Sequence, residues 1–178
     1  MVLAYLEMSV LTATVVLALL FAHAVWHKIS DYGRFLGYVI DYRLVPESMA
    51  EFVARALIAA EAILVLLLLY PATSWLGAVG VGALLLLYGC AMAVNLFRGR
   101  SQIECGCGGA SHPVSWLLVI RNLMLAGMAA LVAMNAVEVL AASALAVALG
   151  AGIGLWLVYN LLGKLAENQR LLTTAGKS

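Results

Sequence analysis

Five stretches of about 20 apolar residues dominate this sequence and constrain its fold more than any other feature. The chain is 65% hydrophobic and 11% charged, and its mean hydropathy is +1.05. A domain of 178 residues cannot bury that much apolar surface within itself. The sequence therefore predicts an all-α integral membrane helical bundle of about five transmembrane helices, solvated by the lipid bilayer. We expect the spans at Leu3–Trp26, Glu51–Tyr70, Trp75–Phe97, Val114–Asn135 and Val139–Leu162.

The segments between the spans are short, except for two. Between the first two spans, Ile29–Met49 has apolar residues at helical spacing, which favours a short amphipathic helix ending near Pro46 over an ordinary loop. Residues 98–113 form the second long connection. We therefore expect residues 1–162 to form the transmembrane bundle and residues 163–178 a polar C-terminal tail.

Two details refine this picture of the spans. No basic residue precedes the first span, so we interpret it as a retained transmembrane helix and not as a signal peptide. In the last span, small residues recur at every fourth position, at Ala146, Gly150 and Gly154. Small residues at this spacing allow close helix contact, and we expect them to pack inside the bundle.

The connection at 98–113 contains Cys105-Gly106-Cys107, followed by two more glycines. Gly106 has no Cβ and lets the backbone bend sharply between the two sulfurs. A disulfide closed over three residues is strained and easily reduced, and such bonds are usually functional. This pattern indicates a membrane thiol–disulfide redox protein with Cys105 and Cys107 as the reactive pair. We expect Cys90, the third cysteine, to be a buried apolar residue, with a role as resolving thiol as the alternative.

Other interpretations of the cysteines stay open at this point. Cys105, Cys107 and His112 offer three metal ligands, and Cys90 would add a fourth. The paired C-x2-C spacing of structural zinc sites is absent, so we predict no metal. Two inert thiols, or an assembly factor that holds a partner without chemistry, are the remaining alternatives.

Several polar residues are expected at membrane depth, in the half of the bilayer that carries the cysteine loop. A charge there is costly and usually faces a partner inside the bundle. Glu61 and Arg121 have similar depths and are the expected ion pair, which either fixes helix rotation or belongs to a polar pocket beneath the loop. Positive charge in such a pocket would favour a reactive thiolate. No sequence feature identifies a cofactor, although a quinone is a candidate for this pocket. The proposed supporting residues are Glu61, Arg121, Asn122, Asn95, His27 and Lys28.

Charge also bears on partners and orientation. A net charge of +1 favours no nucleic-acid partner. With five spans, every Lys and Arg falls on the side of the cysteine loop. The positive-inside rule then puts that loop in the cytoplasm of a multi-pass plasma (inner) membrane protein. The basic residues are Lys28, Arg34, Arg43, Arg55, Arg98, Arg100, Arg121, Lys164, Arg170 and Lys177.

These residues resemble the methylamine-utilisation MauE family, which is related to DoxX-like membrane proteins. The resemblance covers about residues 10–135 and depends on four features of the sequence. These are His27-Lys28 followed by Asp31 and Phe35; Asp41-Tyr42-Arg43-Leu44-Val45-Pro46; Glu61; and Asn95 with Arg98-Gly99, Cys105-Gly106-Cys107-Gly108-Gly109 and Arg121-Asn122. The family usually has an aromatic residue where Gly108 stands, so the sequence departs from the family pattern there.

The resemblance implies a membrane protein that matures a disulfide-rich amine dehydrogenase with a quinone cofactor, or another exported protein. It also implies a thioredoxin-like periplasmic partner, with Cys105 and Cys107 as the redox pair. That role puts the loop outside the cytoplasm, against the charge count. Either the loop takes reducing equivalents in the cytoplasm, or the arginines are functional and the positive-inside rule fails here.

Overall fold

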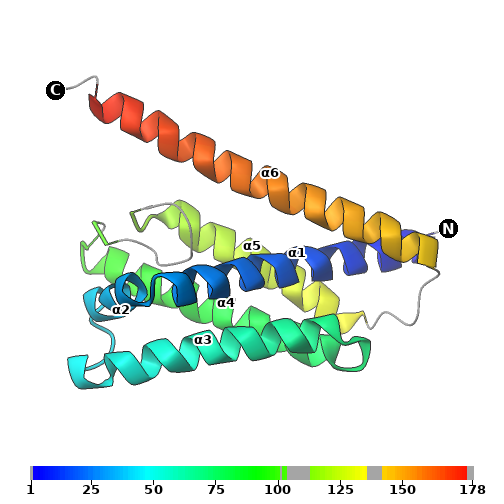
Figure 1. Ribbon diagram of the computed structural model, residues 1–178, viewed down its shortest axis with the longest axis horizontal. Helices are drawn as coiled ribbons and strands as arrows, with labels where there is room; N and C mark the ends of the chain where they lie inside the picture. Colours follow the sequence, from blue (N-terminus) through cyan, green and yellow to red (C-terminus); the bar gives the residue numbers. More distant parts are fainter. Residues whose placement is uncertain (1, 101, 104–112, 136–141, 176–178) are drawn as a thin grey trace.

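The computed structural model describes residues 2–100, 102–103, 113–135 and 142–175, and it is an all-α bundle (Figure 1). Five of the described helices are long and apolar enough to cross a membrane, which confirms the predicted class. Cys105, Cys107, His112 and the expected turn at 136–138 lie outside the described residues. The elements are α1 (Val2–Ser30), α2 (Tyr32–Asp41), α3 (Glu47–Leu69), the 3₁₀ turn η1 (Pro71–Thr73), α4 (Ser74–Phe97), α5 (Trp116–Met134) and α6 (Ala142–Ala175).

Helix α2 is the expected short amphipathic helix between the first two spans. Asp31 caps its N-terminus by accepting a hydrogen bond from the backbone N–H of Arg34 at 3.3 Å. Its apolar side packs against α1 and α3, where Phe35 is buried. The segment after α2 turns at Arg43, whose φ of +48° lies in the left-handed region. This turn lets α3 begin at Glu47 and run back along α1.

A continuous apolar core joins α1, α3, α4 and α5. Leu17 of α1 and Val81 of α4 are fully buried in it, together with Ala129 of α5. Helices α4 and α5 share the most extensive contact in the bundle. Helices α3 and α4 approach closely at Gly77, where a Cβ would stand 2.7 Å from the backbone nitrogen of Leu68. Only glycine fits that crossing without displacing the backbone.

Helix α6 is packed differently from the others. Among the described elements it contacts α1, and its C-terminal half diverges from the rest of the bundle (Figure 1). The contact is close at Gly152, where a Cβ would meet the side chain of Val15 at 2.5 Å. We expected Ala146, Gly150 and Gly154 to pack inside the bundle. This prediction is wrong, because all three residues are exposed. Gly152 lies two positions away from Gly150 and Gly154, which is about 200° around a helix.

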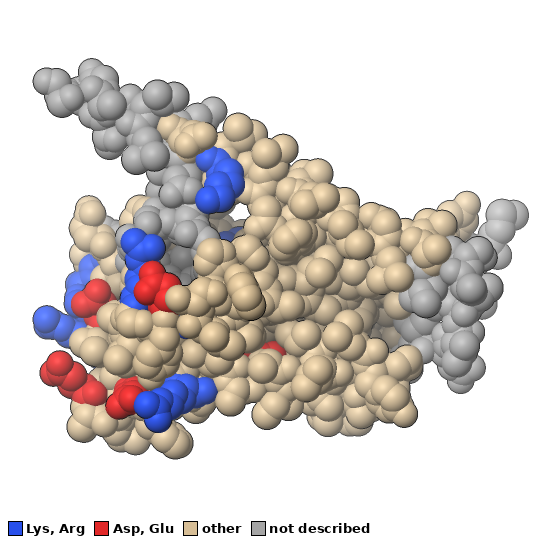
Figure 2. Space-filling model, in the orientation of Figure 1, with Lys and Arg blue, Asp and Glu red and all other residues tan. Residues whose placement is uncertain are grey.

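Charged side chains gather at one end of the bundle, which agrees with the prediction that the basic residues share one side (Figure 2). This end holds α2, the C-terminal end of α1 and the start of α3. The N-terminus of α1 lies at the opposite end (Figure 1). The orientation of the two ends relative to the cytoplasm stays a prediction from charge.

We predict that Gly77→Ala destabilises the bundle, because the added methyl group would press on the backbone of α3. Overpacking of this kind typically costs about 1–3 kcal/mol. Gly127→Ala in α5 is the matched control, since nothing lies within 4 Å of its Cβ position. Thermal unfolding in detergent, followed by circular dichroism, should show a lower midpoint for the first variant only. Equal midpoints would contradict the close crossing of α3 and α4.

Candidate functional site

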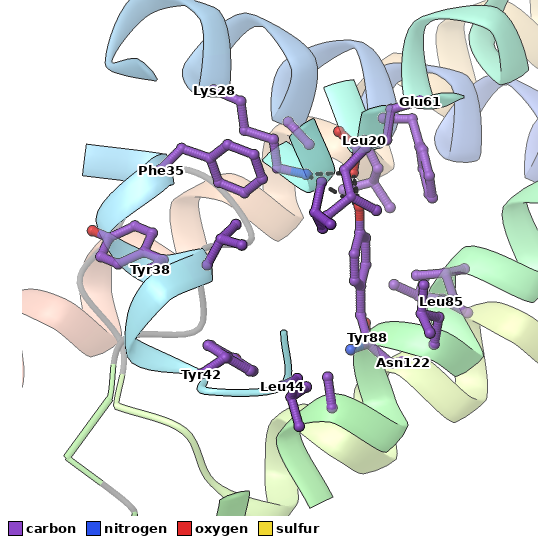
Figure 3. A pocket seen from close by; sticks show the side chains of 18 of the residues that line it. Leu20, Lys28, Phe35, Tyr38, Tyr42, Leu44, Glu61, Leu85, Tyr88 and Asn122 are labelled. Carbon is purple, nitrogen blue, oxygen red and sulfur yellow. Dashed lines mark hydrogen bonds and ion pairs between the residues drawn. The ribbon is translucent and has the colours of Figure 1, made fainter. Parts of the chain in front are cut away.

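A cavity of about 340 Å³ lies inside the bundle, at the end that carries α2 (Figure 3). Its walls are mainly apolar and aromatic, and helices α1 to α5 supply nearly all of them, with Tyr159 added from α6. Polar groups are few among the lining residues. The lining consists of Leu20, Phe21, Ala24, Lys28, Phe35, Tyr38, Val39, Tyr42, Leu44, Val45, Val53, Leu57, Glu61, Leu85, Leu87, Tyr88, Ala91, Arg121, Asn122, Leu125 and Tyr159.

A buried ion pair with a tyrosine marks the polar part of this cavity. The ammonium group of Lys28 in α1 contacts Oε1 of Glu61 in α3. The hydroxyl of Tyr88 in α4 donates to the same carboxylate oxygen at 2.6 Å. Lys28 is 4% exposed and Glu61 is 1% exposed, so both charges are removed from solvent. The three side chains converge from three helices, as the dashed lines in Figure 3 show.

The aromatic surroundings of Lys28 help to stabilise its charge in this position. Its ammonium nitrogen lies 5.0 Å from the ring centroid of Phe35 and 5.0 Å from that of Tyr88. A cation over an aromatic face is attracted by the negative face of the ring, most strongly where water is excluded. Because α1 continues to Ser30 and α2 folds back over it, Lys28 lies buried inside the bundle.

Glu61 therefore forms its ion pair with Lys28, and the expected pairing with Arg121 is wrong. Arg121 lines the same cavity from α5, and its Nη1 donates to the hydroxyl of Tyr159 in α6 at 2.9 Å. A lysine side chain spans more than a helical turn, so Lys28 reaches Glu61 from the end of its helix. The predicted pairing with Arg121 compared only the positions of residues along their helices, and it left out the length of the lysine side chain.

Glu61 and Asn122, which both line the cavity, each have a buried polar atom with no hydrogen-bond partner among the described residues. These atoms are the second carboxylate oxygen of Glu61, Oε2, and the amide nitrogen of Asn122, Nδ2. Both residues are 1% exposed. Asn122 can sit this close to α4 because Gly89 faces it, with 3.7 Å between the Cβ position of Gly89 and the Cβ of Asn122. Buried polar groups normally have partners, so these two atoms call for an explanation.

The other proposed supporting residues lie outside the cavity lining. Asn95 is fully buried, where its amide donates to the Ala91 carbonyl at 3.1 Å and accepts from Arg100 at 3.3 Å. It therefore holds the start of the cysteine connection. The ring of His27 lies edge-on to that of His23 at 4.5 Å, and His23 lies edge-on to Trp156 of α6. His23 therefore belongs to the contact between α1 and α6, and His27 lies beside it on α1.

Of the three cysteines, Cys90 lies within the described residues and Cys105 and Cys107 lie outside them. Cys90 is exposed on the outer surface of α4, so the prediction that it is buried is wrong. Its neighbour Gly89 occupies the face that packs on α5. Within the described ranges no group of metal-ligating side chains occurs, and Cys105, Cys107 and His112 fall outside those ranges.

The described ends of the cysteine connection are fixed beside the cavity. The backbone N–H of Val114 donates to the Ile103 carbonyl at 2.8 Å, which brings the two ends together. Both residues join an apolar cluster with Met92, and Tyr42 packs against that cluster while also lining the cavity. Arg98 adds a further tie, because its Nη1 donates to the Arg43 carbonyl at 3.4 Å.

Sequence reasoning missed the aromatic part of the site. Tyr38, Tyr42, Tyr88 and Tyr159 all line the cavity. Tyr88 carried a usable signal, because it lies seven residues before Asn95 and thus on the same face of α4, the face that packs inward. Tyr38 of α2 and Tyr42 directly after it could not be assigned to a cavity, because nothing in the sequence shows where that helix folds, although Tyr42 belongs to a stretch that resembles the MauE family.

We predict that Lys28→Met strongly destabilises the protein, because it leaves the Glu61 carboxylate buried with Tyr88 alone. Breaking a buried ion pair in this way costs about 3–5 kcal/mol. The double variant Lys28→Met/Glu61→Leu should recover most of that loss, since no buried charge remains. Equilibrium unfolding in mixed detergent would measure all of these free energies. A double variant as unstable as Lys28→Met would contradict the pairing.

The pair between Glu51 and Arg55 provides the control, because it is the same kind of contact at an exposed position. Glu51→Gln should leave stability nearly unchanged, as expected for an exposed ion pair.

Comparison with known proteins agrees with this architecture. The family described as methylamine utilisation protein MauE matches residues 6–135 of this chain. The methylamine utilization protein MauE of Paracoccus denitrificans is 39% identical over 166 residues, which cover 89% of this chain and 89% of that protein. The protein of the same name from Methylorubrum extorquens is 38% identical over 130 residues, covering 71% and 70% of the two chains.

A third relative, MauE of Methylophilus methylotrophus, is 35% identical over 130 residues, covering 71% of this chain and 68% of that one. No solved structure matches the chain. The five apolar spans and these bacterial relatives identify a multi-pass protein of the plasma membrane. The chain therefore belongs to the MauE family.

Proposed function

We propose that this protein is a membrane accessory protein of methylamine utilisation that exchanges disulfides through Cys105 and Cys107. Its target would be a thioredoxin-like partner that serves an amine dehydrogenase or another exported protein. The similarity to MauE proteins over most of the chain is the observation that carries the first part. The Cys-Gly-Cys sequence carries the second, because closely spaced thiols are the chemical requirement of disulfide exchange.

The proposed exchange is balanced in atoms and electrons. A thiolate of one protein attacks a sulfur of the other protein's disulfide and forms a mixed disulfide. The neighbouring thiolate of the attacking pair then displaces the partner sulfur. One disulfide is made and one is broken, while two electrons move from the attacking pair to the other pair.

The described surroundings of the loop support this proposal. The hydrogen bond from Val114 to Ile103 brings the loop ends together. Arg98, which donates to the Arg43 carbonyl, and Arg100, which donates to Asn95, tie its start to the bundle. A firmly held base restricts how far a short loop can travel and so favours docking in one orientation. Arg98 and Arg100 also precede the pair closely in sequence, and cationic neighbours lower the pKa of a thiol.

We predict that Cys105→Ser and Cys107→Ser each abolish partner maturation, because each removes one half of the exchanging pair. One of the two single variants should accumulate a mixed disulfide with the partner, which non-reducing electrophoresis and mass spectrometry would detect. Cys90→Ser is the matched control and should behave as wild type, since Cys90 lies on the outer surface of α4. Normal maturation by the double variant Cys105→Ser/Cys107→Ser would show an assembly factor without thiol chemistry.

The orientation of the loop can be measured in the same strains. The charge distribution predicts that Cys105 and Cys107 face the cytoplasm, where they would take up reducing equivalents, whereas direct exchange with a periplasmic partner needs them at the exterior. In a Cys90→Ser background, we expect a membrane-impermeant maleimide to label the reduced pair in inverted vesicles and not in intact cells. Labelling in intact cells would overturn the charge-based orientation and favour direct contact with a periplasmic partner.

A further inference from the structure

The cavity beside the cysteine connection combines apolar walls with two buried polar atoms that lack partners. Such a combination suits a ligand that is mostly a flat apolar ring and carries a few oxygen atoms. We propose that the cavity binds the ring of a membrane quinone, which accepts electrons from Cys105 and Cys107. The electron transfer in this inference rests on the proposed function, whereas the binding of the quinone does not.

The donor for the oxidised ring is Nδ2 of Asn122. This nitrogen is buried and has no partner among the described residues, although Asn122 is only 1% exposed. An unsatisfied buried donor is costly, and a ligand that supplies an acceptor removes that cost. A quinone carbonyl oxygen is such an acceptor, and it can be placed in an apolar site without bringing in a charge.

The acceptor for the reduced ring is Oε2 of Glu61. Its sister atom Oε1 already receives the Lys28 and Tyr88 contacts, whereas Oε2 has no partner within the described chain. A hydroquinone hydroxyl is a donor and satisfies that oxygen. The cavity therefore offers one unpartnered group suited to each redox state of the same ring.

The rest of the cavity favours a ring over an acyl chain. Aromatic side chains line it at Phe35, Tyr38, Tyr42 and Tyr88, and aromatic groups pair with flat rings by offset stacking. The volume of about 340 Å³ falls within the usual range of small-molecule sites, about 300–1,000 Å³. An acyl chain would fill the space but leave both Asn122 and Glu61 unsatisfied.

The site is also placed to serve the cysteine connection. Tyr42 lines the cavity and packs on the apolar cluster that holds Ile103 and Val114, the described ends of that connection. The coupled reaction is balanced: two thiols form one disulfide and release two electrons and two protons, which convert a quinone to a hydroquinone. Electrons would then flow from the partner's thiols through the loop to the membrane pool.

Binding can be tested on the whole protein in phosphatidylcholine nanodiscs with a photoreactive azidobenzoquinone. We expect saturable labelling, competed by ubiquinone-1 and not by oleic acid, on peptides that contain Tyr38, Tyr42 or Tyr88. The double variant Cys105→Ser/Cys107→Ser should label equally well, since binding does not require the thiols. Equal competition by oleic acid, or no saturable labelling, would overturn the site.

Two pairs of variants locate the ligand. Asn122→Leu should weaken ubiquinone-1 competition about tenfold, the effect of one buried hydrogen bond. Asn160→Leu is its control, because the Asn160 amide donates to its own helix at the Trp156 carbonyl. Ala24→Phe fills the cavity without removing a polar group and should abolish labelling, while Ala22→Phe on the exposed face of α1 should not. Unchanged labelling of Ala24→Phe would overturn the assignment.

Electron transfer is measured separately, by mixing reduced wild-type protein with ubiquinone-1 and following the loss of quinone absorbance. We expect one hydroquinone per disulfide formed, and a much slower reaction for Ala24→Phe. Saturable binding without thiol oxidation would overturn the electron-acceptor role and leave the site standing. Thiol exchange with the partner, but no quinone binding, would overturn this inference while the proposed function survives.

Discussion

The contact between Lys28, Glu61 and Tyr88 is the interaction on which the arrangement of the helices depends. It joins α1, α3 and α4 at a depth where neither charge can be solvated, so each helix must keep the rotation that presents its side chain. Apolar packing alone specifies such rotations weakly, because lipid and neighbouring helices offer similar surroundings to a leucine. A buried ion pair has one satisfactory geometry, and the cavity forms around it.

That geometry also explains why the cavity is lined as it is. Helix α2 must fold back across the end of α1 so that Phe35 can cover the Lys28 ammonium group. The same placement brings Tyr38 of α2, and Tyr42 directly after that helix, to the cavity wall. The short helix therefore links the buried charges to the apolar cluster below the cysteine connection, through Tyr42. A single interaction thus positions both the polar and the aromatic parts of the site.

Hydropathy and length were sufficient to predict the spans, because crossing a bilayer demands about 20 apolar residues and little else. They do not reveal which face of a span points inward when all faces are apolar. This is why Cys90 and the small residues Ala146, Gly150 and Gly154 were assigned to buried faces and are exposed. The residues Glu61, Arg121, Asn122 and Lys28 could be found by their cost in a membrane. Their partners could not, because a long side chain reaches a turn beyond its own Cα.

Helix α6 packs mainly on α1, whereas the other long helices each pack on several neighbours, and this difference affects which positions of the sequence can change. Helices α1, α3, α4 and α5 share one core, and the family match at residues 6–135 ends at the C-cap of α5. The last helix contacts α1 along one side among the described elements. Changes along its outer surface therefore leave the shared core untouched. The exposed side of α6 can thus adapt to new neighbours in the bilayer without rebuilding the interior, whereas Gly152 and Tyr159 are constrained by their contacts with Val15 and Arg121.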